Sequence, residues 1–277
     1  EVTVAGQVLT SEMALLEVPR LMGYWNLDNN LLDSSGNGWD GTATTTDFVS
    51  GIDGSANQFE GTLDETVVID GSEKAFNNFA MGLTVSCWVK MPEGANENWA
   101  IIASKSTNNS NGWELGVNKN TDGPFWAVRG RGALNSEVVI EDDQWHHIVG
   151  TWDGSTGEMA LYIDGELNLE LVDARPALPV DSAVRFGRRN QSGTELPYNG
   201  LLDEVRIYNY AWTPQQAVDS YNVLGEPDKV LCISEYAEQL DVSGPEGEPD
   251  CKIDEYDVAV LASQWLDCNI YPPTNCP

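Results

Sequence analysis

The chain has 277 residues, with 44 Asp and Glu against 14 Lys and Arg, and a formal net charge of −30. This excess of acid argues against binding to a nucleic-acid backbone or docking on an anionic membrane, because both need Lys and Arg side chains. No apolar run approaches the ~18 residues that a membrane-spanning helix needs. The length fits one large domain or two unequal ones.

The composition favours short strands joined by polar turns. The chain contains 26 Gly, 10 Trp and 9 Tyr, and only two stretches rich in Ala, Glu or Leu have a helical pattern. Acidic, Lys-poor and Trp-rich chains are common outside cells, where carboxylates bind calcium and aromatic rings stack on sugars. We therefore expect a secreted, extracellular or cell-surface protein.

Residues 1–19 form an N-terminal arm. Val2, Val4 and Val8 are spaced as in an edge strand, and Pro19 ends a short helix-like piece. An alternating strand of this kind can add to the edge of a neighbouring sheet.

Residues 20–224 form an all-β domain. The pairs Asp153-Gly154 and Asp164-Gly165 lie between apolar strands and predict hairpins, because Gly adopts the positive φ of a tight turn. Thr213 and Pro214 are typical of a helix start and predict about two helical turns. A dozen short strands at this spacing predict an antiparallel jelly-roll sandwich. We expect strands at residues 66–69, 83–91, 100–103, 113–117, 125–128, 137–140, 146–152, 159–163, 167–172, 183–186 and 201–208.

Residues 225–277 form a separate, cysteine-bearing module. An even set of four cysteines in a short acidic segment favours two disulfides, with three possible pairings, and an oxidising compartment. A zinc site is the alternative, but the segment has neither a CxxC pair nor a nearby His to support it. Cys87, in the apolar stretch 83–90, is expected to be a buried free thiol. The four clustered cysteines are Cys232, Cys251, Cys268 and Cys276.

Four motifs follow one another in the 20–224 domain. They lie at residues 23–28 followed by 33–42, at 83–90, at 144–154 with the hairpin at 161–165, and at 199–211. In this order they resemble the laminin-G-like, concanavalin-A-like jelly-roll family over residues 20–212. The resemblance implies a non-catalytic binding domain of this fold.

Asp203 is the most informative carboxylate. Alternation along the last strand puts it in line with Leu201, Val205 and Ile207, where a carboxylate is costly unless it is paired or binds a metal. Many members of the family that this domain resembles hold a structural calcium between the first turn and the last strand. Carried over by position, the resemblance implies the calcium ligands Asp28, Asp33, Asn37 and Asp203, with backbone oxygens near Gly41. The alternative is that these Asp residues only cap turns.

The tail contains a second possible calcium loop. Without residues 245–249, it has oxygen side chains at positions one, three, five, nine and twelve of an EF-hand-type loop. This pattern resembles the dockerin-like modules of secreted bacterial proteins, especially the cysteine-bearing type of planctomycete-like sequences. The insertion, the single loop and Cys251 at the usual Gly position depart from that pattern. The implied ligands are Asp241, Ser243, Asp250, Asp254 and Asp257, with the carbonyl of Lys252.

Several aromatic residues fall in expected turns or loops beside Asn and Arg residues. Exposed aromatic rings stack on sugars and their polar neighbours bind hydroxyl groups, whereas the alternative for each ring is packing in the core. The possible ligand-binding residues are Trp39, Trp99, Trp126, Arg129, Arg131 and Tyr198, and further polar neighbours are Asn108, Asn109, Asn111, Arg188, Arg189 and Asn190.

No sequence pattern indicates catalysis. His146 and His147, the only histidines, point to opposite faces of a strand, which favours structural roles. No carboxylates have the spacing of jelly-roll glucanases, so no catalytic residue is expected. We therefore expect a calcium-stabilised module for binding or adhesion to a glycan or an extracellular protein. The alternatives are a structural subunit of a matrix, filament or surface layer that self-assembles through residues 1–19, and, third, a jelly-roll glycoside hydrolase.

Overall fold

A computed structural model of the chain describes residues 18–77, 81–96, 99–107, 111–173, 179–190 and 195–225, and the backbone of two short N-terminal strands. These strands, β1 (Val2–Val4) and β2 (Gln7–Leu9), pair antiparallel with each other. The alternating valines of the arm therefore lie in a local hairpin. The tail from residue 226 onwards is outside the described residues.

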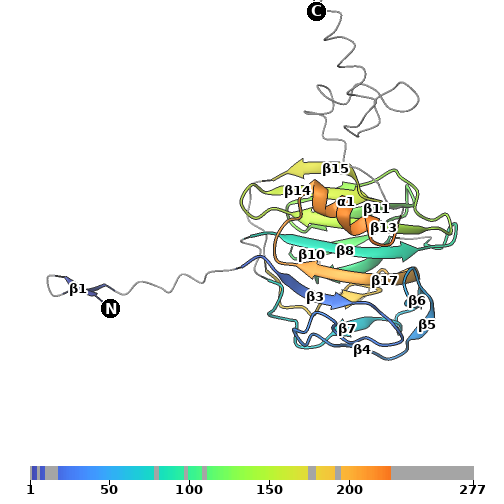
Figure 1. Cartoon of the computed structure of the whole chain (residues 1–277), viewed down its shortest axis with the longest axis horizontal. Coiled ribbons are helices and arrows are strands. Elements are labelled where there is room, and N and C mark those ends of the chain that lie inside the picture. Colours follow the sequence, from blue (N-terminus) through green and yellow to red (C-terminus); the bar gives the residue numbers. More distant parts are fainter. Residues whose placement is uncertain are drawn as a thin grey trace, which may run out of the picture.

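The main domain is an antiparallel sandwich of two sheets, as predicted (Figure 1). In spatial order, one sheet contains β12 (Gly132–Asn135), β11 (Gly123–Val128), β10 (Trp113–Asn118), β9 (Ala100–Lys105), β16 (Arg185–Phe186), β7 (Val67–Ile69) and β4 (Gly41–Ala43). The other contains β15 (Glu166–Val172), β14 (Glu158–Ile163), β13 (Trp145–Trp152), β8 (Leu83–Lys90), β17 (Asn199–Tyr208), β6 (Ser55–Glu60) and β5 (Asp47–Ser50), and β3 (Leu21–Trp25) also pairs with β17. We call the first the seven-stranded sheet and the second the eight-stranded sheet.

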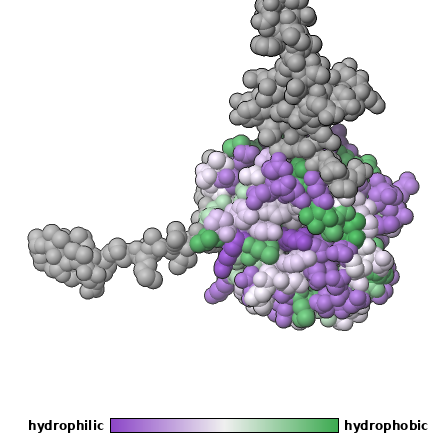
Figure 2. Space-filling model, in the orientation of Figure 1, coloured by the Kyte–Doolittle hydropathy of each residue, from purple (hydrophilic) through white to green (hydrophobic). Residues whose placement is uncertain are grey.

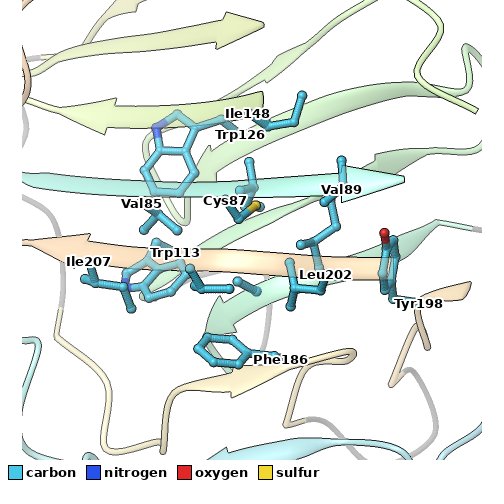
Figure 3. Close-up of a cluster of buried hydrophobic side chains, with 14 of the residues drawn as sticks. Val85, Cys87, Val89, Trp113, Trp126, Ile148, Phe186, Tyr198, Leu202 and Ile207 are labelled. Atoms are coloured by element: carbon cyan, nitrogen blue, oxygen red, sulfur yellow. The ribbon is translucent and has the colours of Figure 1, made fainter. Parts of the chain in front are cut away.

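The core fills the space between the sheets. Figure 3 shows Val85, Cys87 and Val89 projecting from β8 into a cluster that contains Trp113 and Trp126. The centroids of these two indole rings are 6.1 Å apart. Cys87 is a buried free thiol, as predicted, and burial raises its pKa.

Helix α1 (Pro214–Asn222) begins where the sequence predicted it. Thr213 is the N-cap, and its side chain and that of Gln216 form a capping box with each other's backbone N–H groups. The helix lies over the outer face of the eight-stranded sheet (Figure 1), where Tyr221 stacks on Trp88 with ring centroids 5.6 Å apart. On the same face, Figure 2 shows hydrophobic residues in small separate groups among hydrophilic ones.

The predicted strand at residues 137–140 is wrong. The structure instead places β12 at Gly132–Asn135, paired with β11. Val138 and Val139 are 42% and 50% exposed and pack against no sheet partner. Their β-branched side chains raise strand propensity, but propensity alone supplies no neighbour to pair with. The polar strands β4, β5 and β6 were not expected from the sequence.

The buried position of Leu202 generates a first prediction. Leu202→Ala should lower the free energy of unfolding by about 2–5 kcal/mol, because it leaves a cavity between the sheets. The control Leu32→Ala removes the same atoms from a side chain that is 57% exposed and should change stability by about 0.5 kcal/mol or less. Equilibrium urea denaturation measures both. Equal losses in the two variants would contradict this packing.

Candidate functional site

Asp203 does not share a strand face with the core aliphatic residues, contrary to the prediction. The register between β17 and β8 shifts between Asp203 and Arg206, and Glu204 has a φ of +54°. Such a bulge adds one residue and so reverses the alternation of side chains. The residues of β17 that face the core are therefore Leu202, Val205 and Ile207.

Asp203 is nevertheless fully buried, because the turn between β5 and β6 contacts its carboxylate. Oδ2 accepts hydrogen bonds from the backbone N–H groups of Ile52 (3.0 Å) and Asp53 (3.4 Å), and Oδ1 accepts from that of Glu204 (2.8 Å). Burial raises the pKa of Asp203 to about 7, although these N–H groups lower it. An ionised carboxylate is costly here, and a cation beside it would offset that cost.

Asp28 contacts the same β5–β6 turn. Its Oδ1 accepts from the backbone N–H of Ser55 at 2.8 Å. A Cβ atom at Gly54 would overlap Asp28 Oδ1, and one at Gly51 would overlap Asp203 Oδ2. Only glycine therefore fits between the turn and these carboxylates. Two carboxylates that face one turn are oxygen donors of the kind that calcium binds.

The other two predicted calcium ligands belong to a different loop. Asp33 accepts hydrogen bonds from the backbone N–H groups of Tyr24, Ser35 and Trp39 and from the hydroxyl of Ser35. Burial alone would raise the pKa of Asp33, but these hydrogen bonds outweigh it and hold the pKa low. Asn37 donates to the carbonyls of Leu21 and Met22. Within the described part of the chain, no three His, Cys, Asp or Glu side chains converge as metal ligands.

Two of the predicted ligand-binding aromatic residues lie in the core instead. Trp126 is 0% exposed and donates its Nε1–H to the carbonyl of Thr151 at 2.8 Å. Tyr198 is 1% exposed and donates its hydroxyl to the carbonyl of Leu201 at 2.9 Å. Because both rings are buried, neither can stack on a sugar, and this part of the prediction is wrong.

Trp39 and Trp99 are both half-buried, but they belong to different parts of the fold. Trp39 packs against the main core, with its ring 5.3 Å from that of Phe76. Trp99 packs on a smaller cluster, with its ring 5.2 Å from that of Phe125. The members of this cluster, which we call the outer cluster, are Trp99, Ile101, Phe125, Ala127 and Leu196.

The outer cluster lies on the outer face of the seven-stranded sheet. Along β10, Trp113 and Leu115 face the core, so Glu114 between them points outward. Glu114 pairs across the sheet with Ser104 of β9, and Ser104 pairs with Arg185 of β16. A row of polar residues therefore crosses three strands beside the outer cluster.

Glu114 holds two arginines in place. Its carboxylate accepts from the hydroxyl of Ser106, forms an ion pair with Arg129, and pairs with Nη1 of Arg189 at 3.3 Å. Arg129, a predicted ligand-binding residue, also lies over the ring of Phe125 at 5.8 Å. Glu114 itself was missed, although a carboxylate between two apolar residues in a strand was a visible signal.

Arg131 is the remaining predicted arginine of this region. It lies in the turn between β11 and β12, is half-buried, and donates from Nη1 to the carbonyl of Gly130 at 2.6 Å. The structure therefore brings Trp99, Arg129 and Phe125 together, with Arg131 close in sequence to Arg129.

A groove of about 360 Å³ lies beside α1, on the other sheet. Its aromatic residues pack mainly on each other: the ring of Tyr208 is 4.9 Å from that of Trp212 and 5.6 Å from that of Tyr210. Trp212 is only 7% exposed. Trp212 is therefore closed to a ligand, whereas Tyr208 and Tyr210 are half-buried. The lining residues are Arg206, Tyr208, Tyr210, Trp212, Gln216, Asp219, Ser220, Val223 and Leu224.

The two histidines have opposite environments. His146 contacts Asp164 (2.8 Å) and Asp142 (3.1 Å) through its two ring nitrogens. Burial lowers the pKa of His146, but the two carboxylates outweigh it and leave the pKa raised. His147 is fully buried beside Trp88 and Tyr221, and burial lowers its pKa to about 3.

The predicted calcium ligands and cysteines of the tail, from Cys232 to Cys276, all lie outside the described residues. In the described part of the chain, no helix is long and apolar enough to cross a membrane.

Comparison with known families identifies this sandwich. The model of the Laminin_G_3 family, described as the concanavalin A-like lectin/glucanases superfamily, matches residues 69–217, which is more than half of the chain. The chain belongs to this family. The match confirms the jelly-roll resemblance, and the strands that carry the outer cluster and the polar row lie within it.

Similar sequences occur as short parts of much larger proteins. The non-toxic nonhemagglutinin of Paraclostridium bifermentans is 30% identical over 89 residues, which are 31% of this chain and 8% of that protein. A sushi, von Willebrand factor type A, EGF and pentraxin domain-containing protein of Rattus norvegicus is 26% identical over 175 residues, 55% of this chain and 5% of that protein. The chain thus spans less than a tenth of either relative.

Similar solved structures include binding domains. The binding domain of Paraclostridial Mosquitocidal Protein 1 matches with a TM-score of 0.61 at 16% identity, covering 73% of this chain and 52% of that chain. Domain 4 of AbnA, an extracellular arabinanase from Geobacillus stearothermophilus, was solved in complex with arabinotriose. It matches with a TM-score of 0.56 at 22% identity, covering 73% of this chain and 98% of that chain. At these identities the likeness establishes the fold.

The environment of His146 predicts a pH dependence of stability. Because the folded state raises its pKa, the charged ring stabilises the fold fully below about pH 6.5, and this contribution is lost as the pH rises through the folded value. His146→Gln should therefore destabilise the protein more at pH 5.5 than at pH 8.5. His147 is present in both proteins, so its opposite pH dependence cancels in the difference.

Denaturant unfolding of both proteins at the two pH values checks this difference. The control Lys90→Gln breaks the ion pair of Lys90 with Asp143 (3.4 Å) without removing a histidine, and its effect should be equal at both pH values. A pH-independent effect of His146→Gln would show that the two carboxylates do not hold a charged ring.

Proposed function

We propose that this chain is a secreted, non-catalytic module that binds a glycan through the outer face of the seven-stranded sheet. The observation that carries the proposal is the position of Trp99, a half-buried residue of the outer cluster whose ring contacts Phe125, over which Arg129 also lies. Aromatic rings with one open face and polar groups around them are the usual means of holding a sugar ring.

The carbohydrate part of the proposal is supported by the arabinotriose complex of AbnA domain 4, a fold neighbour along 98% of its own length. Similar solved structures also include the binding domain of botulinum neurotoxin DC, in complex with SialylT and with rat synaptotagmin II, which supports recognition of a glycan or a protein by the same fold. Binding alone would be enough for adhesion to such a target.

The carboxylates of this face support a non-catalytic role. Glycoside hydrolysis requires two carboxyl groups that flank the scissile bond. Glu114 is the only Asp or Glu within the seven strands of this sheet, and it is fully buried against Ser106, Arg129 and Arg189. It can neither reach a glycosidic oxygen nor act with a second carboxylate from these strands.

We also propose that calcium stabilises the module at two places. In the main domain, Asp28 and Asp203 would hold it together with backbone oxygens of the β5–β6 turn. In the tail, the EF-hand-type loop that includes Asp254 would hold a second ion, and disulfides among the four tail cysteines would brace it. The cost of burying the Asp203 carboxylate supports the first site, and the sequence alone supports the second.

Trp99 provides the test of glycan binding. Trp99→Ala should weaken binding at least about tenfold, measured on an array of neutral and acidic oligosaccharides that includes arabinotriose. Trp39→Ala is a matched control, because that ring is also half-buried and also meets a Phe ring edge-on, at 5.3 Å against 5.2 Å. The control should leave binding unchanged. No binding by the wild type, or equal losses in both variants, would refute the proposal.

Calorimetric titration of the full chain with calcium tests both metal sites. We expect two binding events, one lost in Asp203→Asn and the other lost in Asp254→Asn, so that each variant is the control for the other. Asp28→Asn, at a half-buried position, should reproduce the first loss if Asp203→Asn folds poorly. The absence of any heat at millimolar calcium would exclude both sites.

A further inference from the structure

Arg185 and Arg188 are two half-buried arginines without a partner in the described part of the chain. Phe186 faces the core, so alternation puts Arg185 on the outer face of the seven-stranded sheet. The Nε–H groups of both arginines are buried and donate to no described residue. Their guanidinium groups form no ion pair with a described residue either. Buried donors of this kind cost free energy unless an acceptor reaches them.

The two guanidinium groups also repel each other. Burial lowers the pKa of Arg185, and the charge of Arg188 lowers it further, while only Glu73 acts in the opposite direction. An anion between them would offset this repulsion and accept hydrogen bonds from their terminal N–H groups.

Positive charge gathers here in a chain that is otherwise strongly acidic. Arg129, Arg185, Arg188 and Arg189 lie on or directly beside the polar row. They are four of the 14 basic residues of a chain whose formal net charge is −30. Within the strands of this sheet, Glu114 is the only carboxylate.

The arginines are close to the outer cluster. Ser104, between Glu114 and Arg185 in the polar row, donates its hydroxyl to the carbonyl of Arg188 at 3.3 Å. Trp99 directly precedes β9, and Arg185 pairs with Ser104 near the other end of that strand, roughly 17 Å farther along. An oligosaccharide of several sugar rings could therefore place one ring on Trp99 and an anionic group at the arginines.

We propose that Arg185 and Arg188 form a subsite for the carboxylate or sulfate group of an acidic glycan. This inference rests on the proposed function and adds the class of sugar. Guanidinium groups bind both anions through paired N–H donors. Glu114 already engages Arg129 and Arg189, which leaves Arg185 and Arg188 as the arginines of the row available to a ligand.

Titrations of the full chain at fixed ionic strength test the subsite. The probes are an oligogalacturonate, which carries only carboxylates, a carrageenan oligosaccharide, which carries only sulfates, and neutral arabinotriose. The variant Arg185→Gln/Arg188→Gln is compared with Arg20→Gln/Lys119→Gln, which removes the same charge from two exposed positions. Arg188→Gln alone lies outside any strand and serves if the double variant does not fold.

We expect the subsite variant to bind at least one acidic probe tenfold more weakly or worse, while the control changes less than twofold. The acidic probe whose binding weakens identifies the anionic group as a carboxylate or a sulfate. Equal weakening in both double variants, or none in the subsite variant, would overturn the subsite. Wild-type binding of arabinotriose but of neither acidic probe would overturn it as well, and would leave the proposed function standing. Binding of no probe would refute both.

Discussion

The fold depends on a change of partner along β17. One edge of this strand pairs with β8 along most of its length, while the other pairs with β6 at residues 199–202 and with β3 at residues 205–208. Asp203 and Glu204, between these two partners, pair with neither of them, and the register of the ladder with β8 shifts at the same break. The Asp203 carboxylate then supplies the acceptors that the backbone N–H groups of Ile52 and Asp53 need at the break. One acidic side chain thus joins β17 to the β5–β6 turn.

The two outer faces of the sandwich differ in what they leave available. On the eight-stranded sheet, α1 covers Trp88 and His147, and the aromatic residues of the groove pack on one another. On the seven-stranded sheet, Trp99 is half-buried, and Arg185 and Arg188 have N–H donors without a partner among the described residues. Since jelly rolls share a core and differ in function, the function belongs to such faces. Trp99 and these arginine donors lie on the same face, which is why we assign the binding site to it.

Local sequence patterns were enough to predict the elements whose geometry is set within a few residues. The hairpin at Asp164-Gly165 forms because both residues have positive φ, +52° and +81°, and α1 begins at Thr213 and Pro214 because capping is local. The orientation of Trp126 was not predictable in this way, because its neighbours Trp113 and Thr151 come from other strands. No residue near Asp203 predicts the bulge either, which lies where β17 passes from β6 to β3.

The candidate site shows the same limit. Trp99 and Arg129 were recognisable as an aromatic residue and a cation in polar surroundings. The polar row was not, because it depends on the register that brings Glu114, Ser104 and Arg185 side by side from three separate strands. Alternation along one strand indicates that Glu114 points away from the core, but only the topology shows that Arg185 lies two strands away on the same face.

The central claim, that a glycan binds on the seven-stranded sheet, is tested most directly by the indole N–H signals of the 10 tryptophans in a nuclear magnetic resonance titration. Substitution of Trp99 and of Trp212 assigns their two signals. If the account is right, an oligosaccharide that binds shifts the signal of Trp99 and leaves that of Trp212, beside α1, in place. A shift of the Trp212 signal with that of Trp99 unmoved would place the binding site on the other sheet and contradict the account.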